Sequence, residues 1–385
     1  MKYLVIGDSN SVHIYNFVKT VLLPNEYEVY LITLSVKPIR EEYKSFYKEN
    51  NVRCFSINNK NDDTLIKKNL FKRIINFLKK IYLIRKVPDV DICHVQSVYK
   101  TSLLMVLLNK HKFNKLILSY WGGDIENRTS YVVKLRKKCF KYANAITVTV
   151  KETYNEFQKI YGEGFNDKLH ICRFATDGLN CINRLKDEVS IDDCKKQYDV
   201  PKGKYCITCG YSAYREQHQD LILELLNSMD EKYKKQIFVI VPLQYGKLED
   251  GYVQEVKNIA EKCDFQCLIL EKFVPFEESV KLAIATDIYI HLRDTDAFSN
   301  ALKEHVYAKS HIIKGDWLKY PELDEMEASI ISIPKYEELI PNITSLMDLI
   351  KISNGEIEVF EPIFELYSTQ AIKKQWEDVI LKVLM

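Results

Sequence analysis

The sequence has 385 residues, of which 46% are hydrophobic and 28% charged, with only 12 glycines and 10 prolines. This composition excludes collagen-like and disordered chains, and the length allows two to three globular domains. The net charge of +2 hides an asymmetry: residues 1–180 hold 30 basic and 17 acidic side chains, whereas residues 181–385 hold 25 and 36. The net +13 and −11 predict that only the first half meets an anionic surface.

The ten cysteines are scattered, mostly in apolar runs, which is typical of a reducing compartment. Cys206 and Cys209 have CxxC spacing, but no second pair completes a zinc site, so we interpret them as structural. The N-terminus does not resemble a signal peptide, and no run of 18 apolar residues occurs. We therefore expect a cytoplasmic protein, with peripheral attachment to the inner face of the cell membrane as a further option.

Short β-branched runs alternate with segments of helical periodicity, which predicts an α/β fold with parallel sheets. In the first half, the predicted strands are 3–7, 27–33, 52–57, 91–96, 115–120, 145–150 and 168–173. The predicted helices between them are 10–22, 64–86, 100–111, 129–142 and 151–161.

The alternation then restarts after a polar joint near 176–203, which contains the turn signals Asp177-Gly178 and Val200-Pro201. The second set of predicted strands is 204–209, 236–242, 266–270, 287–292, 310–314 and 328–333, and its helices are 216–228, 250–262, 275–284, 299–308 and 340–352. We predict two Rossmann-like domains, 1–178 and 179–365, facing across a cleft, and a C-terminal helix within 366–385 that packs on the first domain.

Ligands of such folds bind beyond the carboxyl ends of the strands, so the loops that follow strands are the candidate sites. The first loop runs from Gly7 through Ser9 to His13 and lacks a dinucleotide fingerprint. Its glycine allows a tight turn, and the following helix offers free amides to an anion or a hydroxyl-rich ligand. His13 is a candidate acid, base or sugar-binding group, although helix capping and a structural histidine explain the same residues.

Two further loops carry candidate groups. Trp121-Gly122-Gly123-Asp124 follows strand 115–120, and its glycines would let the backbone approach a ligand with Asp124 beside it. Gly210, Tyr211 and Ser212 follow strand 204–209, and Arg215 and His218 come shortly after, an arrangement that suits a phosphate. The alternatives are a turn with a packed tryptophan in the first loop and a solvated arginine in the second.

The fourth loop follows strand 287–292 and opens a helix, with Ser299 as the expected cap. Asp296 lies before the cap and Glu304 lies five residues after it, so both acids sit near the same end of the helix. Their carboxylates could accept hydrogen bonds from two hydroxyl-bearing groups of one ligand. The alternative is favourable charge near a helix N-terminus.

Residues 64–87 hold eight Lys and Arg and no acid, with apolar residues at helical spacing, and a second basic cluster spans 134–141. Such a segment predicts contact with an anionic membrane surface or, alternatively, a solvated face of an ordinary helix. No helix-turn-helix, RNP or zinc-finger signature is present, so we expect no nucleic-acid partner.

Together these loops resemble the two-domain GT-B glycosyltransferases, particularly family 4, over nearly the whole chain. The family's signature is two acids separated by seven residues, and it corresponds here to Asp296-Ala297-Phe298-Ser299-Asn300-Ala301-Leu302-Lys303-Glu304. The resemblance implies that Glu304 binds the ribose of the nucleotide and Asp296 reaches the donor sugar. It further implies that the amides of Phe298–Asn300 approach the diphosphate.

Two other family motifs have degenerate counterparts. The family's strand-G-R-x4-K-G motif corresponds to Gly210–Asp220, where Tyr211 replaces the arginine and Glu216 and Gln217 stand where its lysine is expected. This leaves Arg215, with His218, to balance the diphosphate. The family's H-G-x-D loop corresponds to Trp121–Asp124, with tryptophan in place of histidine.

Residues 241–288 and the WGGD loop also resemble the transferases that add N-acetylfucosamine to lipid-linked enterobacterial common antigen. The two resemblances imply a glycosyltransferase of bacterial surface polysaccharide synthesis that uses a nucleotide-diphospho-sugar, taken as UDP-linked, without a metal or other cofactor. Its acceptor would be a glycan or lipid-linked glycan, with Asp124 or His13 acting on the acceptor hydroxyl. Family 4 likeness favours retention of configuration. The alternatives are a UDP-sugar 2-epimerase and a non-catalytic carbohydrate-binding subunit.

Overall fold

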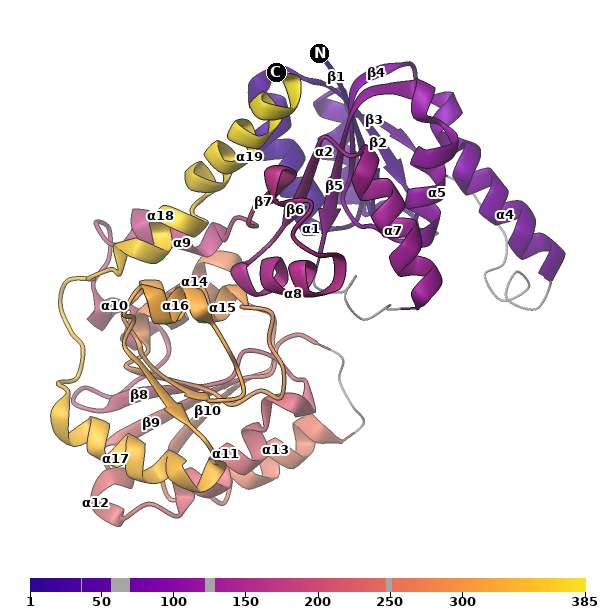
Figure 1. Ribbon diagram of the computed structural model, residues 1–385. Helices are drawn as coiled ribbons and strands as arrows, with labels where there is room; N and C mark the ends of the chain where they lie inside the picture. The colour runs from indigo at the N-terminus through magenta and orange to yellow at the C-terminus, as the bar shows by residue number, and fades with distance from the viewer. Residues whose placement is uncertain (36, 57–69, 122–128, 247–250) are drawn as a thin grey trace. The chain divides into compact units, whose positions relative to one another are not determined.

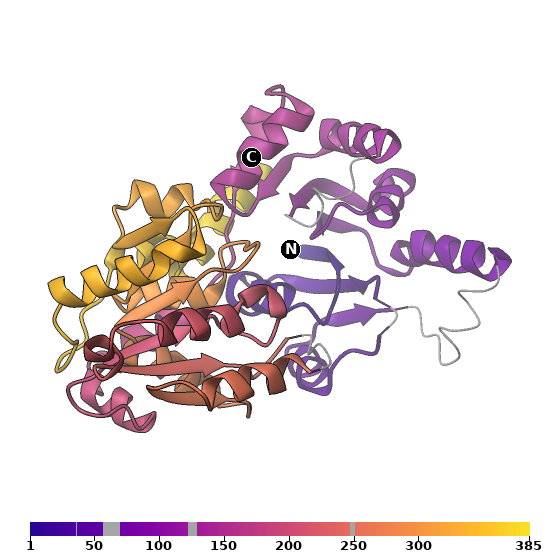
Figure 2. The same ribbon diagram turned by 90° about the horizontal axis from the view of Figure 1, so that it is seen from below.

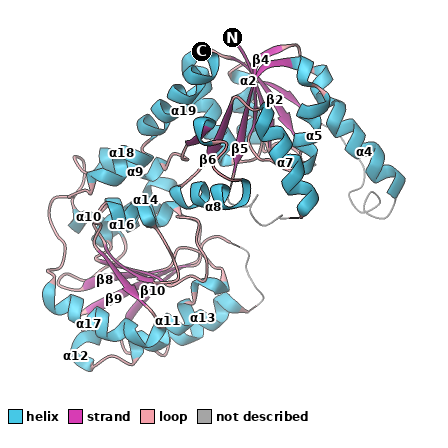
Figure 3. Cartoon of the chain, viewed as in Figure 1, coloured by secondary structure: helices cyan, strands magenta, loops and turns pink. Residues whose placement is uncertain are grey.

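The computed structural model describes residues 1–35, 37–56, 70–121, 129–246 and 251–385, of which residues 70–73 are described by their backbone alone (Figure 1). These residues form two compact units: unit 1 comprises 1–175 and 369–385, and unit 2 comprises 176–368. Each unit has one sheet of parallel strands flanked by helices (Figure 3). The predicted α/β class, with two Rossmann-like domains, is confirmed.

The sheet of unit 1 has seven strands in the order β3-β2-β1-β4-β5-β6-β7. All seven predicted strands are present, as β1 (Lys2–Gly7), β2 (Glu28–Thr33), β3 (Arg53–Phe55), β4 (Val90–Val95), β5 (Phe113–Tyr120), β6 (Ala145–Val148) and β7 (Leu169–Ile171). The central strand β1 is buried on both faces, which explains why it is an unbroken apolar run.

Alternate side chains of β1 divide the core of unit 1 into two layers. Leu4 and Ile6 belong to the layer beneath α5 (Lys100–Leu108), α7 (Ser130–Tyr142), α8 (Lys151–Tyr161) and the 3₁₀ helix Leu83–Lys86, which follows α4 (Leu70–Tyr82). Tyr3 and Val5 face the other layer, covered by α1 (Val12–Phe17), the π-helix Val18–Leu22, α2 (Glu41–Glu49) and α19 (Thr369–Leu384). Figure 2 shows these two groups of helices on opposite sides of the strands.

The sheet of unit 2 has six strands in the order β10-β9-β8-β11-β12-β13, which repeats the topology of unit 1 without its last strand. Here too the predicted strands are present, as β8 (Tyr205–Cys209), β9 (Ile237–Pro242), β10 (Gln266–Leu270), β11 (Ile288–His291), β12 (His311–Gly315) and β13 (Ile330–Ile333). The helices around it are α11 (Gln219–Asn227), α12 (Glu231–Lys234), α13 (Tyr252–Ala260), α14 (Phe276–Ala285), α15 (Asn300–Tyr307), α16 (Pro321–Glu325), α17 (Leu339–Leu349) and α18 (Glu361–Tyr367).

The predicted polar joint at 176–203 contains two packed helices, α9 (Asp177–Leu185) and α10 (Ile191–Gln197). Asp177 begins a helix rather than a turn, since Leu179, Ile182 and Leu185 bury one face of α9. A capping box between Ser190 and Asp193 opens α10. Both helices pack against α14 or α15, and unit 2 therefore begins at residue 176, ahead of the expected 179.

The C-terminal helix α19 returns to unit 1, as the sequence predicted. Its residues Ile372, Trp376, Val379, Ile380 and Val383 are buried in the layer that also contains Tyr3 and Val5. The Trp376 ring lies 4.8 Å from the Phe17 ring and 5.1 Å from the His94 ring, measured between centroids. The last seventeen residues therefore complete the core of unit 1.

We predict that Trp376→Ala lowers the free energy of unfolding of unit 1 by about 3–5 kcal/mol, because truncating a buried aromatic side chain leaves a cavity. Leu381→Ala, on the same helix, serves as the control, since Leu381 is 59% exposed and its loss should cost less than about 0.5 kcal/mol. Urea unfolding of both variants measures the difference. Equal midpoints for the two variants would contradict the assigned packing of α19.

Candidate functional site

In both sheets the strand order changes direction beside the first strand of the unit. Chain connections leave β8 toward β9 and return on its other side to β11, so the loops that follow β8 and β11 diverge between two neighbouring strands. Such a switch point at the carboxyl ends of the strands is where open α/β sheets bind ligands. In unit 2 these two loops contain most of the residues that the sequence predicted.

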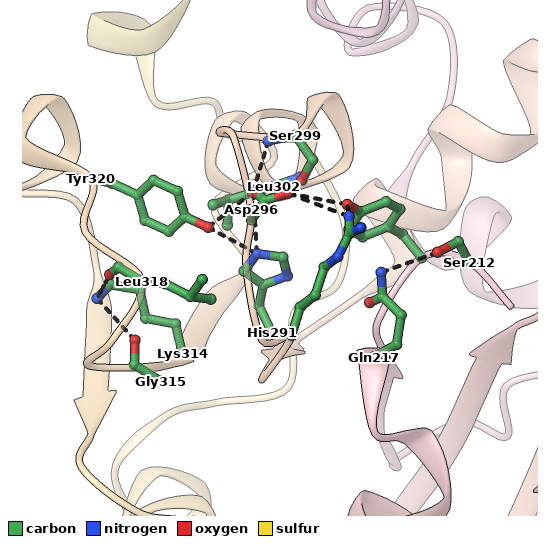
Figure 4. A network of polar contacts seen from close by, with 12 residues as sticks. Ser212, Gln217, His291, Asp296, Ser299, Leu302, Lys314, Gly315, Leu318 and Tyr320 are labelled. Atoms are coloured by element: carbon green, nitrogen blue, oxygen red, sulfur yellow. Dashed lines mark hydrogen bonds and ion pairs between the residues drawn. The ribbon is translucent and has the colours of Figure 1, made fainter. Parts of the chain in front are cut away.

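A buried carboxylate, Asp296, joins the loops that follow β8, β11 and β12 (Figure 4). Its Oδ1 accepts a hydrogen bond of 3.1 Å from the Tyr211 hydroxyl. Its Oδ2 accepts bonds of 2.9 Å from the Tyr320 hydroxyl and 2.8 Å from the Ser299 amide, and lies 3.4 Å from His291 Nε2. With 3% of its side chain exposed, Asp296 therefore acts as a hub that fixes three loops.

The partners of Asp296 determine its protonation state. Burial on its own would raise the pKa of the Asp296 carboxyl, but the hydrogen bond and charge of His291, with the Ser299 amide and Tyr320 hydroxyl, hold that pKa well below its usual range. The hub is therefore an anion at neutral pH. Arg293 adds a cation beside it, with Nη1 at 3.8 Å from Asp296 Oδ1, and pairs through Nη2 with Glu216.

The loop after β8 is held by glutamine side chains. Gly210 has a φ of +65°, and a Cβ there would lie 2.7 Å from Gln217 Oε1, so this position requires glycine. Gln219 is fully buried, and its Nε2 donates to the carbonyls of Cys209, Ser212 and Pro242 at 3.0–3.3 Å. The Ser212 hydroxyl accepts from Gln217 Nε2 at 3.1 Å. Predicted residues Gly210 and Ser212 thus belong to a rigid loop.

The start of α15 differs in part from what the resemblance implied. Ser299 caps the helix as predicted, its Oγ accepting from the Leu302 amide at 3.4 Å. The Ser299 amide, however, already donates to Asp296, so it is occupied by a protein group in this structure. Phe298 takes a φ of +60° and packs against Tyr320 and Tyr367, which aims its side chain into the core. The expected contacts of these amides with a diphosphate stay a prediction.

Glu304 lies against the first turn of α9. A Cβ built on Gly178 would lie only 2.0 Å from Glu304 Oε1, so the absence of a side chain at 178 makes room for the carboxyl. Thr176 Oγ1 also donates to Asn300 Oδ1 at 3.1 Å, which ties the same turn to the start of α15. Burial raises the pKa of the Glu304 carboxyl to about 8, with a further increase from Asp177 that Lys303 opposes.

Arg215 and His218, the predicted diphosphate-binding pair, interact with other acids of unit 2. Arg215 Nη2 lies 2.7 Å from Glu255 Oε2, its Nη1 lies 3.6 Å from Asp220 Oδ2, and its guanidinium is 4.6 Å from the Tyr252 ring. His218 Nε2 lies 2.7 Å from Asp294 Oδ1. The arginine beside Asp296 is therefore Arg293, from the loop after β11. Arg215, from the loop after β8, is joined instead to Asp220 of α11 and Glu255 of α13.

In unit 1 the predicted residues of the first loop lie together after β1. A Cβ at Gly7 would come within 2.3 Å of Ile14 Cδ1, so glycine lets this loop pass close to α1. Ser9 is fully buried, its amide bonded to Thr33 Oγ1 at 3.4 Å, and its hydroxyl has no partner in the part of the chain that is described. Gln96, which follows the neighbouring strand β4, has a buried Oε1 that likewise has no hydrogen-bond partner among the described residues. Both residues lie at the switch point of this sheet.

His13 forms an aromatic cluster with Phe174 and Trp121. Its ring stacks on Phe174 with centroids 3.9 Å apart and meets Trp121 edge-on at 5.9 Å. His13, Gln96, Arg173, Phe174 and Trp376 line a small pocket within unit 1. Asp124, the other predicted catalytic group, lies outside the described residues, as do Gly122 and Gly123.

Sequence reasoning identified Tyr211, Asp296 and Ser299, but missed their partners His291, Arg293 and Tyr320. Because His291 ends β11 and Arg293 lies two residues further, the rule that sites follow strands could have drawn attention to both. Tyr320 and Gly178 have no comparable signal. Tyr320 is 24 residues from Asp296, and nothing in the sequence indicates that Gly178 adjoins Glu304.

Solved structures with this fold include sugar-transferring enzymes. Over 99% of this chain and 100% of the other, it is similar to Anabaena Alr3699/HepE in complex with UDP, with a TM-score of 0.69 and 11% identity. For sucrose-phosphate synthase from Thermosynechococcus elongatus the TM-score is 0.67 and the sequence identity 11%, over 100% of this chain and 99% of the other. For UDP-GlcNAc 2-epimerase from Neisseria meningitidis, bound to UDP-GlcNAc, the TM-score is 0.63 and the sequence identity 12%, over 100% of both chains.

At these identities the likeness shows the fold, which is the two-domain architecture of GT-B glycosyltransferases and UDP-GlcNAc 2-epimerases. No protein-family model matches the chain, and no curated protein does. The solved structures therefore define a class of fold and leave the chemistry of this chain open.

We predict that Glu304→Gln stabilises the protein increasingly as the pH rises. The carboxyl has a pKa of about 8 when folded and an ordinary value of 4.5, so the stability that it supplies as a neutral group is present below pH 4.5 and lost through pH 8. The amide cannot ionise and escapes this loss. At ~1.4 kcal/mol per unit of pKa the full shift corresponds to about 5 kcal/mol, and because Glu304 is only partly buried we expect roughly 2–4 kcal/mol by pH 9. Thermal unfolding of both proteins from pH 5 to 9 measures it, and a constant difference would contradict the burial of this carboxyl.

We predict that Gly178→Ala displaces the Glu304 carboxyl. Alanine favours a helix over glycine by up to about 1 kcal/mol, but a clash of this kind costs about 1–3 kcal/mol, so a net loss of stability is expected. Gly164→Ala is the control, because a Cβ there meets nothing within 4 Å. Urea unfolding compares the two variants, and a stabilised Gly178→Ala protein would contradict the close contact.

Proposed function

We propose that the protein is a glycosyltransferase that moves a sugar from a nucleotide-diphospho-sugar, taken as UDP-linked, to a hydroxyl of a glycan or lipid-linked glycan. The process would be bacterial surface polysaccharide synthesis, and the transfer would retain configuration and need no metal. The observation that carries this proposal is the Asp296 hub at the switch point of unit 2, next to Arg293 and the start of α15.

The hub supports binding of a charged, hydroxyl-rich ligand for two reasons. An ionised carboxylate that is fixed by several donors orients the tyrosines and the arginine around it, so they need no rearrangement when a ligand arrives. Two buried polar atoms beside the hub have no hydrogen-bond partner among the residues that the structure describes. They are Arg293 Nε, which can donate, and His291 Nδ1, which can donate or accept. Glu304, close by in sequence on α15, is the proposed partner of the ribose hydroxyls.

The proposed reaction requires stabilisation of a departing nucleoside diphosphate and activation of an acceptor hydroxyl. Arg215 and amides of the 298–300 segment are the predicted groups for the first task, and Arg293 is a second cation of unit 2 suited to it. His13 or Asp124 would orient or deprotonate the acceptor. The aromatic cluster of His13, Phe174 and Trp121 offers flat surfaces on which a sugar ring can pack.

The UDP-GlcNAc 2-epimerases of the same fold support a second candidate. An epimerase would convert the nucleotide sugar with no acceptor present, so product analysis after incubation with the donor alone distinguishes it from a transferase. The third candidate, a carbohydrate-binding subunit, would bind glycan but no nucleotide diphosphate.

The function is tested by a thermal-shift screen of UDP and UDP-sugars, with a TDP-linked N-acetylfucosamine donor included because of the second resemblance. A ligand at about 100 times its Kd should stabilise the folded state by about 2.7 kcal/mol. We predict that Glu304→Ala loses the shift and the turnover of the donor identified in the screen, while circular dichroism stays unchanged.

Glu261→Ala provides the matched control, since Glu261 is an exposed acid of unit 2 at the end of α13. This variant should retain both the thermal shift and turnover. Wild-type activity in Glu304→Ala with the true donor would overturn the assignment, as would the failure of every nucleotide sugar to stabilise the protein.

A further inference from the structure

Three neighbouring helices of unit 1 carry an unusual distribution of charge. Helices α4, α5 and α7 lie side by side on one face of the seven-stranded sheet (Figure 1). Their sequences contain ten Lys and Arg and no Asp or Glu. By contrast, α2 on the opposite face holds three glutamates. These helices therefore carry a net charge of +10, against +13 for the whole of residues 1–180.

The exposed cations of this surface are close together. Lys134, Lys137, Lys138 and Lys141 follow one another along α7 at helical spacing, and all four are exposed. Lys79 is exposed on α4. Like charges placed this closely repel one another and together attract an anionic partner.

Large apolar side chains are exposed among these cations. On α4, Ile74, Leu78 and Tyr82 are 48%, 45% and 42% exposed, and their spacing of four residues aligns them along one side of the helix. Leu108 at the end of α5 and Tyr131 and Tyr142 at the two ends of α7 are also exposed. A helix face that stays in water gains nothing from large exposed apolar side chains.

Cations of this region lie against aromatic rings of the neighbouring helices and so link the three helices. Lys100 at the start of α5 has its Nζ 6.0 Å from the Phe77 ring of α4 and 5.2 Å from the Tyr131 ring of α7. Lys110 Nζ lies 3.0 Å from the Tyr142 ring centroid. We call this surface, with its apolar residues Ile74, Leu78, Tyr82 and Leu108, the α4–α5–α7 face.

We propose that the α4–α5–α7 face docks onto a bilayer that contains anionic lipids. The apolar stripe of α4 would enter the boundary between headgroups and acyl chains, and the lysines of α7 would contact lipid phosphates. The exposed leucine and isoleucine side chains favour a bilayer over nucleic acid, whose phosphates would attract the cations but leave these groups in water. Among the described residues no helix is long and apolar enough to cross the bilayer, so the contact is made at its surface.

This proposal extends the predicted membrane contact of residues 64–87, of which 64–69 lie outside the described residues, to a surface built from three helices. It does not depend on sugar transfer, because binding to lipid requires neither donor nor turnover. Its failure would leave the proposed glycosyltransferase activity untouched, and the failure of that activity would leave the membrane contact untouched.

The test is sedimentation of the full chain with vesicles of phosphatidylcholine containing 40% phosphatidylglycerol, and with vesicles of phosphatidylcholine alone. We expect binding to the anionic vesicles that weakens as salt is added. Replacing Lys134, Lys137 and Lys138 with Gln should lower the partition coefficient about a hundredfold, at ~1 kcal/mol per cation. The matched control replaces Lys19, Lys44 and Lys48, exposed lysines associated with the opposite face of the same unit, and should bind as the wild type does.

Leu78→Gln isolates the apolar part of the surface. It should weaken binding to the anionic vesicles several-fold, whereas Leu349→Gln, which changes a leucine of unit 2 that is 82% exposed, should have no effect. Thermal unfolding of every variant confirms that it is folded. The proposal is overturned if anionic vesicles fail to bind the protein, if the lysine variants and their control bind equally, or if Leu78→Gln leaves vesicle binding unchanged while RNA binds to the lysine face.

Discussion

The switch point of unit 2 depends on one ionised carboxylate. Asp296 accepts hydrogen bonds from side chains that follow β8 and β12 and from the backbone at the start of α15, and it lies against His291 at the end of β11. A buried anion costs several kcal/mol unless donors surround it, and the same donors then become fixed in position. The three loops at the switch point of the sheet are therefore held together by the cost of leaving this charge unpaired.

Asp296, before α15, and Glu304, on α15, have opposite protonation states at neutral pH. Donors and a histidine hold Asp296 ionised, whereas burial raises the pKa of Glu304, eight residues later, to about 8, and among the described residues no hydrogen-bond donor is recorded for its carboxyl. Pairs of acids whose environments separate their pKa values are typical of functional sites. A ligand that donates hydroxyl groups to Glu304 would favour its ionised form, so binding and proton release would be linked there.

The strands and the sequence-local parts of the site could be predicted because their signals are local. Every predicted strand is present, since a strand buried on both faces of a parallel sheet must be an apolar, β-branched run. Gly7, Gly210 and Ser299 were identifiable from turn and cap chemistry. The failures were also local in origin: Asp177-Gly178 is a turn signal by composition, yet packing of Leu179 and Ile182 makes it the start of a helix.

By itself, the sequence determined the two α/β units, the positions of their strand-following loops, the two acids near α15, and the net positive charge of the first half. Tertiary structure alone decided which groups meet: Tyr320 with Asp296, Gly178 with Glu304, Arg215 with Glu255, and three helices in one basic face. The physical reason is that propensity and periodicity act over a few residues. Contacts between residues far apart in the chain arise only when the strand order brings their loops to the same edge of a sheet.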